Sequence, residues 1–209
     1  MRVLAVDTVS PAPSLALLLP GAAPEGGGPP VDVEPLGAAA AEELVRHVST
    51  LLDRHGLRAA DLERVAVVSG PGSFTGLRAG AAFARGLAVA RGVPLAAVPT
   101  FVAAARALEP GTPLLALLDA GRGDVLASRL TPGGGADPEG GRLLRRGDAE
   151  ALARAEGISV ADLDRLALPL AAAAARLCAG GSRELPPLLE ALSYGRPSAA
   201  EERFPPPCR

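Results

Sequence analysis

The sequence predicts an α/β protein built on a mostly parallel sheet, and three observations support that class. Continuous apolar runs at residues 3–6, 65–68 and 114–118 show no alternation, as is typical of strands buried on both faces. Residues 65–91 read as a strand, a glycine turn and a helix in direct succession. The chain is 48% hydrophobic, which is enough for a sizeable core.

Length and composition set the limits of this class. The 209 residues allow one large domain or two small lobes, and we expect an N-terminal lobe over 1–103 and a smaller C-terminal lobe over 104–209. Aromatic residues make up only 2%, so Leu, Val and Ala must form the core. The formal charge of −2 offers no electrostatic basis for nucleic-acid binding by the chain alone.

Location is inferred from what the sequence lacks. It contains no signal peptide and no apolar run of membrane-spanning length, so we expect no membrane association. Two cysteines are too few for a disulfide framework. A reduced, cytoplasmic protein is the expectation.

The elements before the central turn follow from simple patterns. After the first strand, residues 14–19 and 31–36 are expected as strands, with Pro35 weakening the second. The Gly/Pro-rich connector 21–30 lies between them. Residues 39–55 form a clean amphipathic helix that ends at Gly56, because six apolar side chains share one face. These are Ala41, Leu44, Val45, Val48, Leu51 and Leu52.

The central turn is the sequence Gly70-Pro71-Gly72, which breaks the strand at 65–68. Ser73 and Thr75 are the candidate N-caps of the helix that follows. That helix is expected to continue to Arg91, with Gly92 as its stop. A strand, a glycine turn and a helix N-terminus make a generic anion site, and a plain tight turn is the alternative.

The helix from Gly76 to Arg91 is apolar almost all round, so it must be buried on more than one side. We expect Leu77, Phe83 and Leu87 to pack on the protein's own sheet. A stripe of small side chains should then face outward and allow a partner helix to approach closely. The predicted partner interface comprises this stripe and two arginines at its rim: Arg78, Ala79, Ala82, Arg85, Gly86 and Val89.

The rest of the chain is expected to form a second set of strands and helices. A short strand at 95–98 closes the first lobe, and a glycine-rich surface loop is expected at 131–141. The tail 204–209 is expected to be disordered. The other predicted elements are a helix at 100–108, an antiparallel return strand at 125–130, and helices at 148–156, from 162 and at 169–179.

The eleven residues 70–80, Gly-Pro-Gly-Ser-Phe-Thr-Gly-Leu-Arg-Ala-Gly, resemble the signature of the TsaB family. Residues 3–8 and 118–120 are also similar to that family, and 194–196 more weakly. The resemblance implies a two-lobed actin-like/sugar-kinase (ribonuclease H-like) ATPase fold with a reduced second lobe.

The same resemblance implies a scaffold or activator subunit without catalysis of its own. Such a subunit binds TsaD and supports threonylcarbamoyl transfer to the adenosine next to the tRNA anticodon. TsaE is a further expected partner, tRNA is reached only through the complex, and a homodimer forms when the chain is alone. No cofactor is expected. Homodimer and heterocomplex both stay open as resting states, as does a nucleotide at the partner interface.

Asp7 and Thr8 follow the first strand. In actin-like and sugar-kinase ATPases an acidic residue at this exit reaches the metal–phosphate group, and the resemblance implies that this site is degenerate in TsaB. The pair is therefore expected to be a vestigial phosphate loop. The favoured alternative is a turn in which the Asp7 carboxylate accepts hydrogen bonds from nearby backbone N–H groups.

Two enzymatic classes compete with the scaffold. An ATP-dependent phosphotransferase needs a catalytic base and further phosphate loops, and only Asp7 is available. A peptidase needs a metal site or an activated nucleophile. His47 and His55 are eight residues apart on one helix, about 12 Å in rise, so they cannot ligate one ion. We therefore assign no catalytic residue and no metal ligand.

Overall fold

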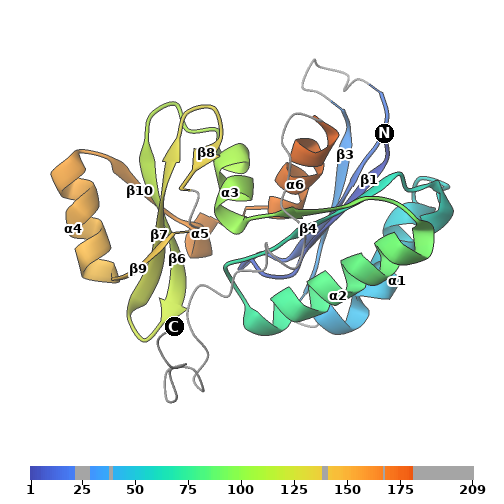
Figure 1. Cartoon of the computed structure of the whole chain (residues 1–209), viewed down its shortest axis with the longest axis horizontal. Helices are drawn as coiled ribbons and strands as arrows, with labels where there is room; N and C mark the ends of the chain where they lie inside the picture. Colours follow the sequence, from blue (N-terminus) through green and yellow to red (C-terminus); the bar gives the residue numbers. More distant parts are fainter. Residues whose placement is uncertain (22–28, 38–39, 138–140, 167, 181–209) are drawn as a thin grey trace, which may run out of the picture.

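The computed structural model describes residues 1–21, 29–37, 40–137, 141–166 and 168–180. Its first sheet has the strand order β3-β2-β1-β4-β5 (Figure 1). Strand β1 pairs antiparallel with β2 and parallel with β4, which in turn pairs parallel with β5. The strands are β1 (Val3–Asp7), β2 (Ser14–Leu18), β3 (Val31–Pro35), β4 (Arg64–Val68) and β5 (Leu95–Val98), close to the expected ranges.

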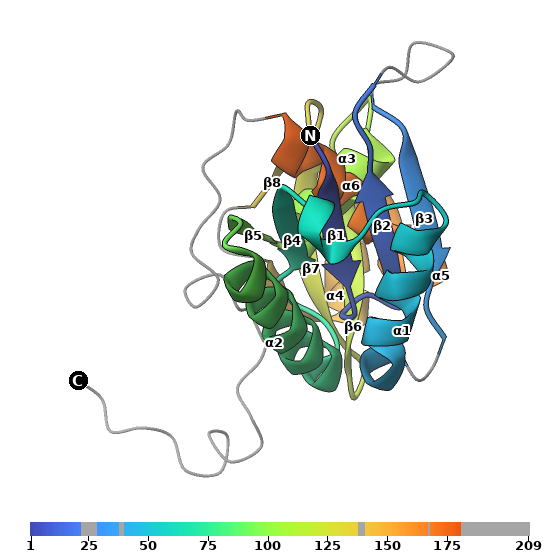
Figure 2. The same ribbon diagram turned by 90° about the vertical axis from the view of Figure 1, so that its right-hand side faces the viewer.

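Two helices cover one face of this sheet and lie beside each other in both views (Figures 1 and 2). They are α1 (Ala40–Asp53) and α2 (Phe74–Arg91). A short 3-10 turn, η1 (Ala59–Asp61), precedes β4. Leucines and valines of the sheet and both helices form one apolar cluster here, so this face is the outer core of the first lobe.

The second sheet has the order β10-β6-β7-β8, with β9 also paired to β7. Helix α4 (Arg146–Glu156) covers its outer face, and the short α5 (Leu163–Leu166) follows β10 (Figure 1). The strands are β6 (Leu114–Gly121), β7 (Asp124–Thr131), β8 (Gly135–Ala136), β9 (Arg142–Arg145) and β10 (Ser159–Asp162).

The second sheet differs from the expectation in three strands. The predicted surface loop at 131–141 contains β8, and β9 and β10 were not expected at all. Each of these strands is only two to four residues long. Strand β8 pairs with β7 directly before it, while β9 and β10 pair with β7 and β6 from further along the chain. Segments this short show no clear periodic pattern in the sequence. They form strands because they pair with other strands of the fold.

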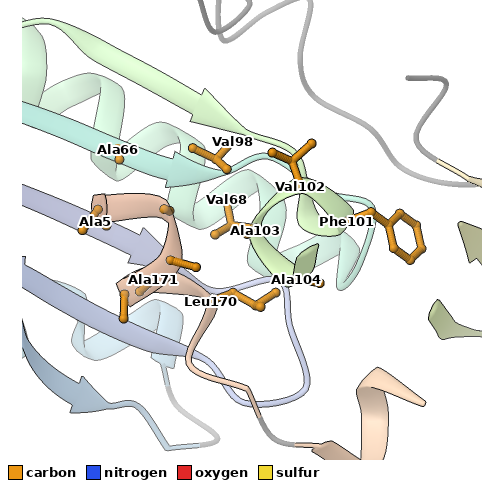
Figure 3. Packing of buried hydrophobic residues seen from close by; sticks show 14 of the residues in the cluster. Ala5, Ala66, Val68, Val98, Phe101, Val102, Ala103, Ala104, Leu170 and Ala171 are labelled. Carbon is orange, nitrogen blue, oxygen red and sulfur yellow. The ribbon is translucent and has the colours of Figure 1, made fainter. Parts of the chain in front are cut away.

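Helices α3 (Thr100–Leu108) and α6 (Leu170–Ala179) occupy the space between the two sheets (Figure 1). Figure 3 shows Leu170 and Ala171 of α6 next to Val68 and Ala103 in the main core. Because α6 is nearly all alanine, its backbone packs closely on β1, β2 and β4. This helix from the C-terminal half of the chain therefore completes the inner face of the first sheet.

Within the described ranges, no helix is both long and apolar enough to cross a membrane. Part of the connector predicted at 21–30 and the whole tail at 204–209 lie outside those ranges.

Candidate functional site: the signature turn and the outer face of α2

The signature turn lies at the carboxyl end of β4, where the chain turns back into α2. Ser73 is the N-cap of α2, since its hydroxyl accepts a hydrogen bond from the Gly76 N–H at 3.2 Å. Thr75, the other candidate cap, lies inside the first turn and is exposed. Gly92 ends the helix in the left-handed conformation, as expected from the sequence.

The glycines of the signature allow the loop after β1 to contact α2 directly. A Cβ on Gly76 would overlap the Thr8 carbonyl oxygen, and one on Gly80 would overlap the Thr8 hydroxyl. The Thr8 hydroxyl instead donates to the Gly76 carbonyl at 2.6 Å. The Ser73 N–H donates to the Val9 carbonyl at 2.9 Å. The turn thus fastens the first turn of α2 to the end of β1.

The same turn holds the start of α3. The Thr100 N–H donates to the Gly70 carbonyl at 2.8 Å, and the Thr100 hydroxyl donates to the Pro71 carbonyl at 2.7 Å. Thr100 is fully buried, so both hydrogen bonds are shielded from water. The segment 70–73 is therefore a junction between β1, α2 and α3.

Asp7 is fully buried at the exit of β1, and its carboxylate is used within its own turn. One oxygen accepts from the N–H groups of Val9 and Ser10 at 3.0 and 3.1 Å. The other accepts from the Ser10 hydroxyl at 2.5 Å. Burial raises the pKa of Asp7 to about 6, against the lowering effect of these hydrogen bonds. This geometry matches the alternative in which the Asp7 carboxylate holds a turn by accepting hydrogen bonds from nearby backbone N–H groups.

A small cavity lies next to this turn. The cavity there has a volume of about 10 Å³, which is room for a single water molecule. Small-molecule sites usually need several hundred Å³. The cavity is lined by four leucines, two residues of the loop after β1 and the first residue of α3: Leu118, Leu163, Leu168, Leu170, Ser10, Pro11 and Thr100.

Helix α2 has an inner apolar face and an outer face of small side chains. Leu77 is fully buried, while Phe83 and Leu87 are half-buried against the outer core. Val89 is 74% exposed. Of the predicted interface residues, Ala79 is half-buried, and the rest are exposed: Arg78, Ala82, Arg85, Gly86 and Val89.

Sequence reasoning missed Phe74, whose side chain is 53% exposed at the start of α2. The guanidinium of Arg78 lies 5.6 Å from the centre of the Phe74 ring, within the range of a cation–π contact. An aromatic residue four positions before an arginine on a predicted helix was the available signal. We add Phe74 to the outer face of α2, which we define as Phe74 together with the six predicted interface residues.

His47 of α1 and His55, which lies two residues beyond the end of α1, make separate contacts with β3. The His47 Nδ1 lies 3.0 Å from a Glu34 oxygen, and the His55 Nε2 lies 2.9 Å from an Asp32 oxygen. Among the described residues, no group of three or more His, Cys, Asp or Glu side chains is placed to hold a metal ion. These contacts attach α1 to the edge strand.

Comparison with known proteins places this fold and signature in context. Residues 33–174 match the family model described as TsaD, tRNA N6-adenosine threonylcarbamoyltransferase. The Escherichia coli tRNA threonylcarbamoyladenosine biosynthesis protein TsaB is 32% identical over 128 residues, which cover 60% of this chain and 53% of that protein. A Pyrobaculum aerophilum tRNA N6-adenosine threonylcarbamoyltransferase is 37% identical over 110 residues, 47% of this chain and 31% of that enzyme.

The matched region spans about half the length of the TsaB relative and about a third of the Pyrobaculum enzyme. The solved structure of YeaZ from Pseudomonas aeruginosa superposes with a TM-score of 0.61 at 24% identity, covering 91% of this chain and 97% of that one. The predicted two-lobed α/β fold is therefore confirmed, and so is the resemblance to TsaB.

Proposed function

This chain belongs to the TsaD family, described as tRNA N6-adenosine threonylcarbamoyltransferase, and we propose that it acts there as a non-catalytic, TsaB-like subunit. In this role it binds TsaD and activates threonylcarbamoyl transfer to the adenosine next to the tRNA anticodon. The observation that carries the proposal is the outer face of α2, which presents small and apolar side chains to solvent on a firmly anchored helix.

Three features favour a subunit without chemistry of its own. Both carboxylate oxygens of Asp7 accept hydrogen bonds from donors of its own turn. The cavity beside it is too small for a nucleotide. The described residues also contain no group of three or more His, Cys, Asp or Glu side chains placed to hold a metal ion. The phosphotransferase alternative depends on Asp7 alone, whereas the Asp7 carboxylate here accepts hydrogen bonds that hold a turn.

The interface of the proposed complex is the outer face of α2. Ala82 and Gly86 would let a partner helix approach to about 8 Å between axes, the close end of the usual range. Val89 and Phe74 supply the large apolar contacts, and burying them removes their exposed surface from water. No acidic residue occurs between Phe74 and Arg91, so a partner that offers carboxylates to Arg78 and Arg85 is favoured.

The remaining partners follow from the same role. TsaE is proposed to join the complex and supply its ATPase activity. A homodimer through α2 is proposed for the chain alone, because pairing removes the exposed apolar side chains of this face from water. With a formal charge of −2 and 2% aromatic residues, contact with tRNA is proposed to occur only through the complex, within the cytoplasm.

Reconstitution tests the proposed function directly. The pure chain should neither hydrolyse ATP nor modify tRNA. Adding TsaD, TsaE and a source of threonylcarbamoyl-adenylate should give modified tRNA, and leaving this chain out should abolish it. ATP turnover by the pure chain that is lost in an Asp7→Ala variant would instead establish the phosphotransferase. Equal modification with and without the chain would refute the activator role.

A further inference from the structure

A groove of about 400 Å³ lies on the outer face of the second sheet, beside α4. Its origin is geometric. Strands β10, β6, β7 and β9 are spaced about 4.8 Å apart, so this face is about 14 Å across. One helix with its side chains is only about 10 Å wide, and α4 is the helix that covers this face. Because α4 packs through Ala149 and Ala153, it leaves the neighbouring part of the face open.

The floor and one wall of the groove are apolar. Leu115 on β6, Ala127 on β7 and Leu144 on β9 lie on the same face of the sheet, and Leu152 of α4 forms the wall. Leu115 and Ala127 are almost completely buried, which makes the floor part of the folded core. The groove is therefore built into the sheet, and its volume falls within the usual range of small-molecule sites.

Charged side chains form the rim, and most of them are already paired. The Arg129 guanidinium lies 2.6 Å from the Glu156 carboxylate, which ties β7 to the end of α4. The backbone N–H of Arg129 donates to the Asp137 carboxylate at 2.8 Å. These contacts hold one end of the groove in a fixed shape. Asp137 keeps its negative charge there, because its partner is a neutral backbone N–H.

Arg142 is the exception. It lies opposite Ala127 in the strand register, on the groove side of β9, and is exposed. Its side chain forms no hydrogen bond or ion pair with any residue that the structure describes. The groove therefore combines an apolar floor with one uncommitted guanidinium, a group that matches a carboxylate, sulfonate or phosphate.

We propose that this groove binds a small organic anion with a flat apolar body. The apolar part lies on Leu115, Ala127 and Leu144, and the anionic group pairs with Arg142. The volume suits a body of one or two fused rings, and the preformed Arg129–Glu156 pair limits its length. This site lies on the second lobe, away from the outer face of α2, and does not depend on the proposed function.

The test is titration of the full-length chain with 2-naphthoate and with 2-naphthamide, a neutral probe of the same shape, followed by amide chemical shifts and calorimetry. We expect 2-naphthoate to bind in the millimolar range or tighter, with shifts at β7, β9 and α4. The neutral amide and the Arg142→Gln variant should each lower the affinity about fivefold, as for a partly exposed ion pair. Leu152→Trp fills the groove and should abolish binding.

Arg154→Gln is the matched control, since Arg154 is an exposed arginine of α4 that does not line the groove. It should bind 2-naphthoate like the wild-type chain. Equal affinity for both probes, or an unchanged affinity in Arg142→Gln, would overturn the anion site. Failure to bind 2-naphthoate would overturn the proposal, because the groove would then be closed to small molecules. Chemical shift changes at the groove on raising the protein concentration alone would also overturn it, because a second copy of the chain would then cover this face. Arg142→Gln decides the matter if Leu152→Trp does not fold.

Discussion

Replacing Asp7 by Asn should stabilise this protein at neutral pH, because the native carboxylate is buried and no described residue places a cation beside it. The folded state raises the pKa of Asp7 from 3.8 to about 6, with desolvation as the largest cause. A group whose pKa is raised by folding stabilises the protein when protonated, and this contribution is lost as the pH rises from about 4 through about 6. At pH 7 the ionised carboxylate therefore costs on the order of 3 kcal/mol, from about two pKa units at 1.36 kcal/mol each.

Asparagine fits the same turn without a change in shape. Its carbonyl oxygen can accept from the N–H groups of Val9 and Ser10, and its NH₂ can donate to the Ser10 hydroxyl, which also accepts. The turn keeps three hydrogen bonds, with the one between residue 7 and the Ser10 hydroxyl reversed in direction, and the variant removes the buried charge.

The assay is urea denaturation of the wild type and Asp7→Asn at pH values from 4 to 8, with Asp53→Asn as an exposed control. The stability difference should be small at pH 4 and reach about 2–3 kcal/mol in favour of Asp7→Asn at pH 7. Asp53→Asn should stay within about 0.5 kcal/mol throughout. A variant less stable than the wild type at pH 7 would refute the reasoning, because the turn would then require the ionised form.

Two further predictions concern the signature helix and RNA. Gly76→Ala should destabilise the fold by at least about 2 kcal/mol, because its Cβ meets the backbone carbonyl of Thr8, which cannot move away cheaply. Gly86→Ala, on the open side of the same helix, should stabilise the protein by about 0.5–1 kcal/mol. Thermal melting compares the two variants. Similar changes in stability for both would contradict the packing role of Gly76. The chain alone should bind tRNA no tighter than about 10⁻⁴ M at physiological salt, and a gel shift at low micromolar protein would disprove this.

Most of the first lobe could be predicted because its signals are local. The α2 helix has its cap at Ser73 and its stop at Gly92, and both lie where the sequence pattern indicates. The position of α6 could not be predicted in this way. Its alanines predict a helix, but contact with β1, β2 and β4 depends on the path of the whole second lobe. Strands β9 and β10 were missed for the same reason, since they exist only through pairing with β7 and β6.

The site was predictable in outline and incomplete in chemistry. The small stripe of α2 could be assigned to the surface because the larger side chains had to face the sheet. The need for glycine at positions 76 and 80 could not be predicted, because it comes from contact with Thr8, about 70 residues earlier in the chain. The raised pKa of Asp7 likewise follows from complete burial, which no motif around that residue indicates.

The central claim is that the outer face of α2 is the docking surface, and Ala82→Arg tests it most directly. Ala82 is exposed in the middle of this face, so an arginine there leaves the monomer intact but prevents close helix contact and would be desolvated in a complex. Ala151→Arg, at an exposed alanine of α4, is the matched control. The measurement is capture of TsaD by each variant, with light scattering and thermal melting of the chain alone. We expect Ala82→Arg to melt within about 0.5 kcal/mol of the wild type yet lose both TsaD capture and self-association, while Ala151→Arg retains them. Capture of TsaD by Ala82→Arg at the wild-type level would contradict the claim.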